Sequence, residues 1–238
     1  MKTLDQSYEE PAMNLACDEI LLNEVDSNQR EATLRFWEPQ SPFVVIGYGN
    51  NIHSECLIES CRRNNIQILR RISGGGTVLQ ARGCLNYSLI LPINDEFGTK
   101  NINSTNCHIM KTHQMAFNKA LNNGVTIEGH TDLALDGLKF SGNAQKRKKN
   151  ALVFHGTFLL NLEIKLLDLS LKMPSLEPKY RKGRSHHNFC RNIPISVSST
   201  KKLIKKTWEA QDIANPVDDK KIEELTITKY TQKKWIYR

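Results

Sequence analysis

The sequence lacks the features that mark membrane-spanning and disulfide-stabilised proteins. No apolar run approaches the length of a bilayer span, and residues 1–6 contain no hydrophobic stretch of the kind found in signal peptides. The six cysteines include no Cys-x-x-Cys pair, so their spacing indicates neither a zinc site nor a disulfide framework. We therefore expect a cytoplasmic protein with free thiols.

Two widespread nucleotide-binding signatures are missing as well. Three glycines occur at residues 74–76, but no Gly-Lys-Ser or Gly-Lys-Thr follows them, which excludes a P-loop. No Gly-x-Gly-x-x-Gly motif opens a helix, which excludes the common dinucleotide fingerprint. Acidic residues are in deficit, with 25 Asp and Glu against 33 Lys and Arg and a formal charge of +8. That charge favours an anionic partner, such as nucleic acid, a nucleotide or an acidic protein, without choosing among them.

The length and composition predict one large domain of the α+β class. The chain has 238 residues, 39% hydrophobic and 24% charged, which is enough to bury a substantial core. Strands dominate its centre and helices flank them, without an internal repeat. The expected strands are 33–37, 43–46, 66–69, 85–91, 125–127, 133–135, 138–140 and 151–162. The expected helices are 12–25, one capped by Ser54 and carrying residues 57–61, one ending near 121, then 163–171, 200–210 and 218–230.

Some connections and helix faces are also predicted. Residues 101–106 are expected to form a polar connection before the third helix, and residues 175–192 a basic, irregular segment. In the first helix, Asp18 and Glu19 fall away from the apolar face, so we expect both side chains outside the core.

A glycine-rich stretch, Arg-Arg-Ile-Ser-Gly-Gly-Gly-Thr-Val at residues 70–78, separates two expected strands. Glycines have no Cβ to block a ligand and adopt positive φ freely, so backbone N–H groups can converge on an anion. Arg70 and Arg71 add positive charge and fork-shaped donors. A hairpin loop with solvated arginines is the simpler alternative, and the glycines alone do not decide against it.

Two further motifs follow the glycine-rich stretch. In residues 132–145, Asp136-Gly137 stands between apolar runs and predicts a tight hairpin. Lys139 then falls on the return strand, beside an expected turn of small residues at 141–144. The expected strand from residue 151 contains the sequence His-Gly-Thr at residues 155–157.

Together the three motifs resemble the lipoate–protein ligase family, within the broader biotin/lipoate ligase group. The matching patterns are Arg-Arg-x-Ser-Gly-Gly-Gly, Asp-Gly-x-Lys-x-Ser-Gly-Asn-Ala and His-Gly-Thr-x-Leu-Leu, in that order. Weaker matches lie at residues 14–19, 34–37 and 44–47, and the resemblance covers roughly residues 10–192. It implies a biotin/lipoate ligase-like catalytic domain with a mixed β-sheet core flanked by helices. We expect this domain at residues 1–195, with 196–238 as a short helical extension packed on it, too short for the added C-terminal domain of many larger ligases.

The resemblance implies that lipoate is activated with MgATP to lipoyl-AMP and then transferred to a lysine. The implied acceptors are acidic lipoyl domains, either of the 2-oxoacid dehydrogenase E2 type or of the glycine-cleavage H protein, with no nucleic acid or membrane partner. An accessory protein carrying the C-terminal domain is also a possible partner. Lys139 would be the catalytic residue, because a fixed ammonium stabilises negative charge in the transition state. The ordinary alternative is a solvated strand lysine.

The resemblance also implies a set of substrate- and adenylate-binding residues. They are Arg71, Ser73, Gly74, Gly75, Gly76, Thr77, Val78, Gln80, Asn86, Ser141, Gly142, Asn143, Ala144, His155, Gly156 and Thr157. Gln80 stands where many relatives carry histidine, which leaves the acyl-chain preference open, and His155 has the alternative of a hydrogen-bonded strand histidine. Asp132 is a candidate ligand for Mg²⁺, against the alternative of a plain strand-end aspartate. Residues 146–149 are basic and either close over the adenylate, meet an acidic acceptor or lie in solvent.

Cysteine separates the ligase hypothesis from its main alternative. Octanoyltransferases related in sequence use a cysteine nucleophile before the Asp-Gly-x-Lys hairpin, and residues 124–131 contain none. An ATP-independent octanoyl- or lipoyltransferase would have to use Cys84 or Cys107. Cys84 has the alternative of a small buried residue. A third hypothesis is a non-catalytic binder of nucleic acid or lipoylated partners, although no helix-turn-helix is appended.

Overall fold

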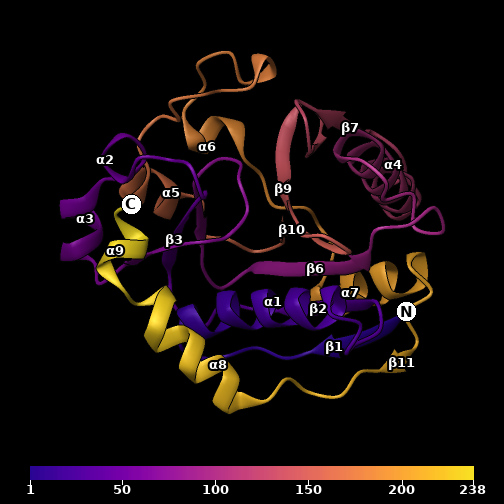
Figure 1. Cartoon of the computed structure of the whole chain (residues 1–238). Helices are drawn as coiled ribbons and strands as arrows, with labels where there is room; N and C mark the ends of the chain where they lie inside the picture. Colours follow the sequence, from indigo (N-terminus) through magenta and orange to yellow (C-terminus); the bar gives the residue numbers. More distant parts are fainter.

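The computed structural model describes residues 1–238 and contains one large and one small β-sheet (Figure 1). The large sheet has eight strands in the order β11-β1-β2-β6-β10-β9-β8-β7, and the small sheet has the order β4-β3-β5. The strands are β1 (Lys2–Asp5), β2 (Thr33–Trp37), β3 (Phe43–Ile46), β4 (Gln67–Arg70), β5 (Val78–Gln80), β6 (Cys84–Pro92), β7 (Val125–Glu128), β8 (Asp132–Leu135), β9 (Leu138–Arg147), β10 (Ala151–Leu159) and β11 (Asp212–Ile213).

Helices surround both sheets. They are α1 (Pro11–Asp26), α2 (Ile52–Glu55), α3 (Ile58–Arg63), α4 (Ile102–Ala120), α5 (Lys165–Ser170), the 3₁₀ turn η1 (Lys179–Arg181), α6 (His186–Phe189), α7 (Val197–Thr207), α8 (Asp219–Leu225), the π-helical turn η2 (Thr226–Tyr230) and α9 (Lys233–Ile236). None of them combines the length and the apolar character that crossing a bilayer requires. The predicted mixed sheet with flanking helices is confirmed, since β1 runs parallel to β2 while β6, β10 and β9 are antiparallel neighbours.

The central strands β2 and β6 of the large sheet are buried on both faces, and their side chains alternate between these faces. In β6, Leu85, Tyr87, Leu89 and Leu91 point into a core that also contains Ile109 and Phe117 of α4 and Ile204 of α7. The intervening residues of β6 point to the other face, which α1 covers. Because side chains alternate between the two faces of a strand, the polar residues Asn86 and Ser88 share that second face.

Helix α1 lies along the second face of the large sheet, and the C-terminal segment crosses beneath it (Figure 1). Pro11 opens the helix, where a missing N–H costs nothing. Its buried side chains include Leu15, Ala16 and Leu21, which pack in the core that the small sheet shares. The expectation for Asp18 was wrong, because this side chain is only 3% exposed and points to the sheet.

The β8–β9 hairpin forms at Asp136-Gly137 as predicted, with left-handed φ values of 53° and 72°. A register shift places Lys139 opposite Ala134 and leaves Phe140 as an extra residue in β9. Phe140 is fully buried against Phe117, so the bulge is fixed by packing. The expected turn of small residues at 141–144 was wrong, since β9 continues to Arg147 in register with β10.

Two other predicted boundaries were wrong for local reasons. Ser54 lies inside α2, whose cap is Asn51, and α3 begins separately at Ile58. Residues 102–106 are helical, because Asn101 and Ser104 form a reciprocal capping box that starts α4 at once. The polar character of that first turn is therefore a solvent-exposed helix face.

Candidate active site

A cavity of about 590 Å³ lies between the large and the small sheet. Most of the residues predicted to bind substrate line it, together with the predicted Lys139 and Asp132. These lining residues are Arg71, Gly75, Gly76, Thr77, Val78, Gln80, Asn86, Asp132, Lys139, Ser141, Gly142, Asn143, Ala144, His155, Gly156 and Thr157. Ser73 and Gly74 do not line it. Both accept hydrogen bonds from the Arg71 guanidinium, the buried Ser73 through its hydroxyl and the exposed Gly74 through its carbonyl oxygen.

Arg71 is a buried cation without a carboxylate partner. Its guanidinium donates to the carbonyl oxygens of Gly74 and Gly76 at 2.6 and 2.7 Å and to Ser73 Oγ at 2.9 Å. Burial lowers the pKa of Arg71 to about 10, so the group stays protonated at neutral pH. A buried charge that has only neutral acceptors is poorly compensated, and a carboxylate or phosphate in the cavity would compensate it.

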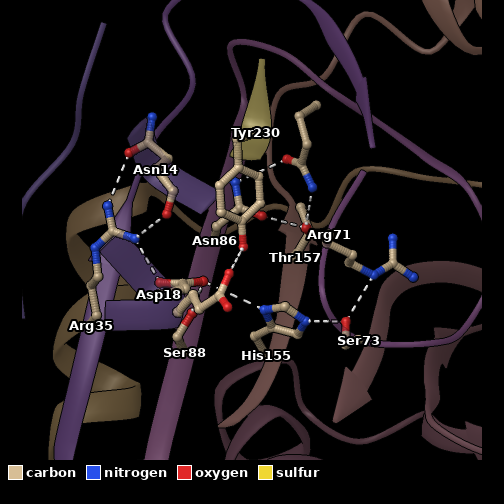
Figure 2. Close-up of polar contacts among 12 residues, drawn as sticks. Asn14, Asp18, Arg35, Arg71, Ser73, Asn86, Ser88, His155, Thr157 and Tyr230 are labelled. Atoms are coloured by element: carbon tan, nitrogen blue, oxygen red, sulfur yellow. Dashed lines mark hydrogen bonds and ion pairs between the residues drawn. The ribbon is translucent and has the colours of Figure 1, made fainter. Parts of the chain in front are cut away.

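Next to Arg71, a chain of hydrogen bonds runs along one face of the large sheet, across its strands (Figure 2). Ser73 Oγ lies 2.6 Å from His155 Nε2, and His155 Nδ1 lies 3.4 Å from Asp18 Oδ2. Asp18 also accepts a hydrogen bond from Ser88 Oγ at 2.7 Å and pairs with Arg35 at 2.6 Å. With Nδ1–H directed at the carboxylate, His155 Nε2 accepts from the Ser73 hydroxyl. The chain therefore fixes the ring of His155 and the position of Ser73.

The pKa of Asp18 lies below its ordinary value even though its side chain is buried. Burial by itself would raise this pKa, but the adjacent Arg35 guanidinium and the hydrogen bond from His155 lower it by more than burial raises it. Asp18 is therefore ionised at neutral pH. It forms a buried ion pair with Arg35, which is itself fully buried.

The rows of the sheet explain why these side chains meet. Arg35 of β2 pairs with Ser88 of β6, and Ser88 pairs with His155 of β10. In the next row, Asn86 pairs with Thr157. Directly paired residues on neighbouring strands bring their side chains to the same face.

The second row carries its own closed network of side chains. Gln80 Nε2 donates to Thr157 Oγ1 at 2.6 Å, Thr157 Oγ1 donates to Asn86 Oδ1 at 2.5 Å, and Asn86 Nδ2 donates to Gln80 Oε1 at 2.9 Å. Each of the three has its partners within the group, so the network is rigid. Gln80 thus takes a supporting position in the cavity wall.

Lys139 lies on the wall formed by β8 and β9. Its ammonium is 2.8 Å from Asp132 Oδ1, and Tyr180 donates to the other oxygen of Asp132 at 2.8 Å. The Lys139 side chain crosses Gly142, where an added Cβ would lie 2.8 Å from Nζ. A larger residue at position 142 would therefore force the flexible end of the Lys139 side chain to move.

Asn143 is held from three sides. Its Oδ1 accepts from Tyr87 OH at 2.6 Å, its Nδ2 donates to Thr131 O at 2.7 Å, and its carbonyl accepts from Thr131 Oγ1 at 2.6 Å. The side chain fits because Gly156 has none, as a Cβ there would meet Asn143 Oδ1 at 1.7 Å. This explains why the motif pairs Gly-Asn-Ala on one strand with His-Gly-Thr on the next.

The cysteines differ in their access to the cavity. Cys84 is 1% exposed and burial raises its pKa to about 12, while Cys107 is exposed on α4 and does not line the cavity. Cys190 lines the cavity, and its backbone forms a bridge with Lys139. Burial raises the pKa of Cys190, although the charge of Lys139 opposes the rise.

Sequence reasoning missed several cavity residues, among them Leu15, Asp18, Trp37, Tyr87, Ser88 and Cys190. For Ser88 a signal was present, because it follows Asn86 at strand spacing on the face that carries polar residues. For Asp18 the helical pattern gave the wrong face. Cys190 lies in the segment expected to be irregular, where spacing carries no information about position.

Replacing Gly75 with valine is expected to abolish ligand binding while leaving the fold intact. Gly75 has a φ of 84°, and a Cβ there would lie 3.1 Å from Arg71 Nη2 and 3.4 Å from Ala144 Cβ. A branched residue resists this φ and would displace the Arg71 guanidinium from the cavity. Calorimetric titration with a lipoyl-adenylate analogue, beside a melting curve, checks the prediction. An unchanged affinity in the folded variant would contradict it.

The family model for the lipoyl protein ligase A/B catalytic domain matches residues 10–220. The chain is 28% identical to lipoate–protein ligase 1 of Staphylococcus aureus over 239 aligned positions, which cover 96% of this chain and 70% of that protein. It is 31% identical to the lipoate–protein ligase LplJ of Bacillus subtilis, covering 71% of this chain and 48% of the relative. It is also 30% identical to the octanoyltransferase LipM of Clostridioides difficile, covering 74% and 71%. The chain thus spans between about half and 70% of these relatives.

Solved structures share the fold over almost the entire chain. A crystal structure of lipoate–protein ligase A bound with ATP superimposes with a TM-score of 0.82 at 20% identity, covering 99% of this chain and 98% of that one. A bipartite lipoate–protein ligase of Thermoplasma acidophilum gives a TM-score of 0.79 at 20% identity, covering 99% and 95%. The chain belongs to the lipoyl protein ligase A/B catalytic domain family.

Proposed function

We propose that this protein is a lipoate–protein ligase that forms lipoyl-AMP from lipoate and MgATP and then lipoylates a lysine of an acceptor domain. The observation that carries this proposal is that two of the cations that line one cavity, Arg71 and Lys139, come from two of the predicted motifs and from different elements. Arg71 has no carboxylate partner, and Lys139 lies on β9 across Gly142. Such a site suits a reaction that joins two anions.

The first step brings a carboxylate against a phosphate. A lipoate carboxylate oxygen forms a bond to the α-phosphorus of ATP, and the bond from that phosphorus to pyrophosphate breaks. Negative charge is concentrated between the reactants, and fixed positive groups stabilise it in the transition state. Arg71 would hold the carboxylate or the adenylate phosphate, and the Lys139 ammonium would lie against the developing charge.

The second step needs no enzyme thiol. The neutral amine of the acceptor lysine forms a bond to the lipoyl carbonyl carbon, AMP leaves with the electron pair of the carbon–oxygen bond, and the amine proton passes to solvent. Lys139 would donate a hydrogen bond to the carbonyl oxygen. His155 and Asn143, held by their own partners, would shape the pocket.

Magnesium would enter with ATP. Both oxygens of Asp132 have protein partners, and no group of three or more Asp, Glu, His or Cys side chains could hold a metal ion. We therefore propose that the phosphates supply most ligands of the ion. The metal role of Asp132 stays a prediction.

The acceptor is proposed to be an acidic lipoyl domain, of the E2 type or the H-protein type. The net charge of +8 favours this, and the Thermoplasma ligase is described together with its E2 lipoyl domain. Lys146 lies at the end of β9, where positive charge could meet such a domain. A separate protein carrying a C-terminal domain is proposed as an accessory partner, and the cytoplasm as the site of action.

Pyrophosphate release with ATP and lipoate, with and without an apo lipoyl domain, tests the proposal. We expect release that depends on lipoate, and a gain in the acceptor mass equal to one lipoyl group. Lipoylation or octanoylation of the acceptor without ATP, from an acyl carrier protein, would instead support the transferase alternative.

A second candidate function, octanoyl transfer, is favoured by the position of Cys190. Its thiolate would form a bond to the carbonyl carbon of an octanoyl thioester, releasing the carrier thiol, and the acceptor amine would then displace Cys190. One observation disfavours it relative to the ligase: burial raises the pKa of the Cys190 thiol and so disfavours the thiolate that must attack.

Replacing Cys190 with serine is therefore expected to leave ATP-dependent lipoylation within about threefold of the wild-type rate. Serine is nearly isosteric, and attack on an acyl-adenylate requires no sulfur. Mass spectrometry of the wild type after incubation with octanoyl-acyl carrier protein provides the control. An acyl-enzyme adduct on Cys190, together with loss of octanoyl transfer in Cys190→Ser, would support the transferase and contradict the ligase proposal.

A further inference from the structure

Arg70 is a second buried cation without a carboxylate partner, and it points away from the cavity. The side chains of neighbouring residues in an extended chain point to opposite sides. The Arg71 side chain points into the cavity, so the Arg70 side chain points away from it. Its Nε and Nη2 donate to the carbonyl oxygen of Ile236 at 3.0 and 2.7 Å, and Nε also to that of Trp235 at 3.1 Å. A segment from the far end of the chain therefore accepts the hydrogen bonds of Arg70.

The other side of the Arg70 guanidinium holds the loop at residues 47–50. Nη1 donates to three carbonyl oxygens of this loop at distances of 2.8 to 3.0 Å. The backbone N–H of Tyr48 in turn donates to the carbonyl oxygen of Ser73 at 2.8 Å. The guanidinium thus joins the C-terminal segment to the loop that supports the glycine-rich stretch.

The C-terminal segment is held at two further points. Trp235 Nε1 donates back to the carbonyl oxygen of Arg70 at 2.9 Å. Lys229 and Tyr230 bind the carboxylate of Glu19, both at 2.7 Å. Glu19 follows Asp18 on α1, so this helix contacts the cavity with one residue and the C-terminal segment with the next. Residues of α8 and η2 contact α1, and α9 contacts β4. Figure 1 shows this yellow segment running from below α1 to α9, near the C-terminus.

We propose that residues 229–236 form a strap that positions the glycine-rich loop for its anionic ligand, with Arg70 and Trp235 as positioning residues. The Arg70 guanidinium makes six donor contacts. Three go to the strap, and three go to the loop at residues 47–50, so this one group joins both to β4 next to Arg71. If the strap detaches, Arg70 loses two of its five acceptor oxygens, and the backbone that frames Arg71 loosens. By linkage, a ligand that needs the ordered loop binds more weakly in the detached state.

Substitutions at Trp235 test the strap against a matched control. Trp235→Phe keeps an aromatic ring and removes the N–H donor, while Trp235→Ala removes both. Ile222→Ala is the control, because Ile222 is fully buried in α8 but takes no part in the Arg70 contacts. For a lipoyl-adenylate analogue, we expect affinity to fall about fivefold in Trp235→Phe and about tenfold or more in Trp235→Ala, against less than about twofold in Ile222→Ala. The KM for lipoate should rise more than kcat falls.

The choice of a lipoyl-adenylate analogue as ligand rests on the proposed function. Hydrogen exchange of the ligand-free protein tests the strap without that ligand. The N–H groups of Arg71 and Tyr48 are hydrogen-bonded, to Ile46 and Ser73, and should exchange at least about tenfold faster in Trp235→Phe than in Ile222→Ala. Failure of the wild type to bind the analogue would count against the ligase and leave the exchange result valid. Equal exchange at Arg71 and Tyr48 in the two variants would overturn the strap.

Discussion

Replacing Lys139 with alanine is expected to slow lipoyl-AMP formation by about two to three orders of magnitude, the usual cost of removing a group that stabilises transition-state charge. The side chain lines the cavity, is 25% exposed and lies on a bulged strand whose geometry is fixed by the buried Phe140. The fold should survive, because no core contact depends on the ammonium. Pyrophosphate release by the folded variant is the direct measurement.

The neighbouring Asp132 provides the control for Lys139→Ala. Removing Lys139 leaves a carboxylate that is 14% exposed without its cation, which by itself can disturb β8 and β9. The double variant Lys139→Ala with Asp132→Asn removes that charge and should remain equally inactive. Recovery of pyrophosphate release in the double variant would mean that Lys139 only neutralises Asp132.

Replacing Arg35 with methionine is expected to lower the free energy of unfolding by about 3–5 kcal/mol, the typical cost of leaving one partner of a buried ion pair uncompensated. Arg35 is fully buried, and its guanidinium also donates to Asn14 Oδ1 at 3.0 Å and to the carbonyl oxygen of Gln6 at 2.9 Å. Urea unfolding of the variant gives the value. A loss below about 1 kcal/mol would show that Asp18 takes up a proton at little cost.

The double variant Arg35→Met with Asp18→Asn tests the physical reason. Removing both charges should recover a large part of the lost stability, because no uncompensated ion remains. It should not restore ligand binding, since His155 then loses the carboxylate that fixes its ring and, through Ser73, the position of Arg71. Full binding in the double variant would show that this chain of hydrogen bonds is purely structural.

Much of the fold could be predicted from local patterns. The helix at 11–26, the strands at 33–37 and 43–46, and the hairpin at Asp136-Gly137 all follow from spacing and turn chemistry within a few residues. The errors at Ser54 and at residues 101–106 concern helix starts, where several polar residues compete to cap. The small residues at 141–144 suggested a turn, but they form part of β9 because they pair with β10.

The same distinction between local patterns and long-range contacts applies to the candidate site. Sequence motifs were enough to predict the glycine-rich stretch after a strand, a lysine on a strand and the His-Gly-Thr strand, because each depends on residues that are close in the sequence. Four features of the site become visible only in the folded chain: Asp18 contacts His155, Arg70 and Arg71 point to opposite sides, Ser73 supports Arg71, and Cys190 lines the cavity. These outcomes depend on strand register and on the path of the last residues, which brings the carbonyl oxygen of Ile236 to the side chain of Arg70, 166 positions away. Local periodicity contains no information about such pairings, since the burial of both sheets and α1 together selects them.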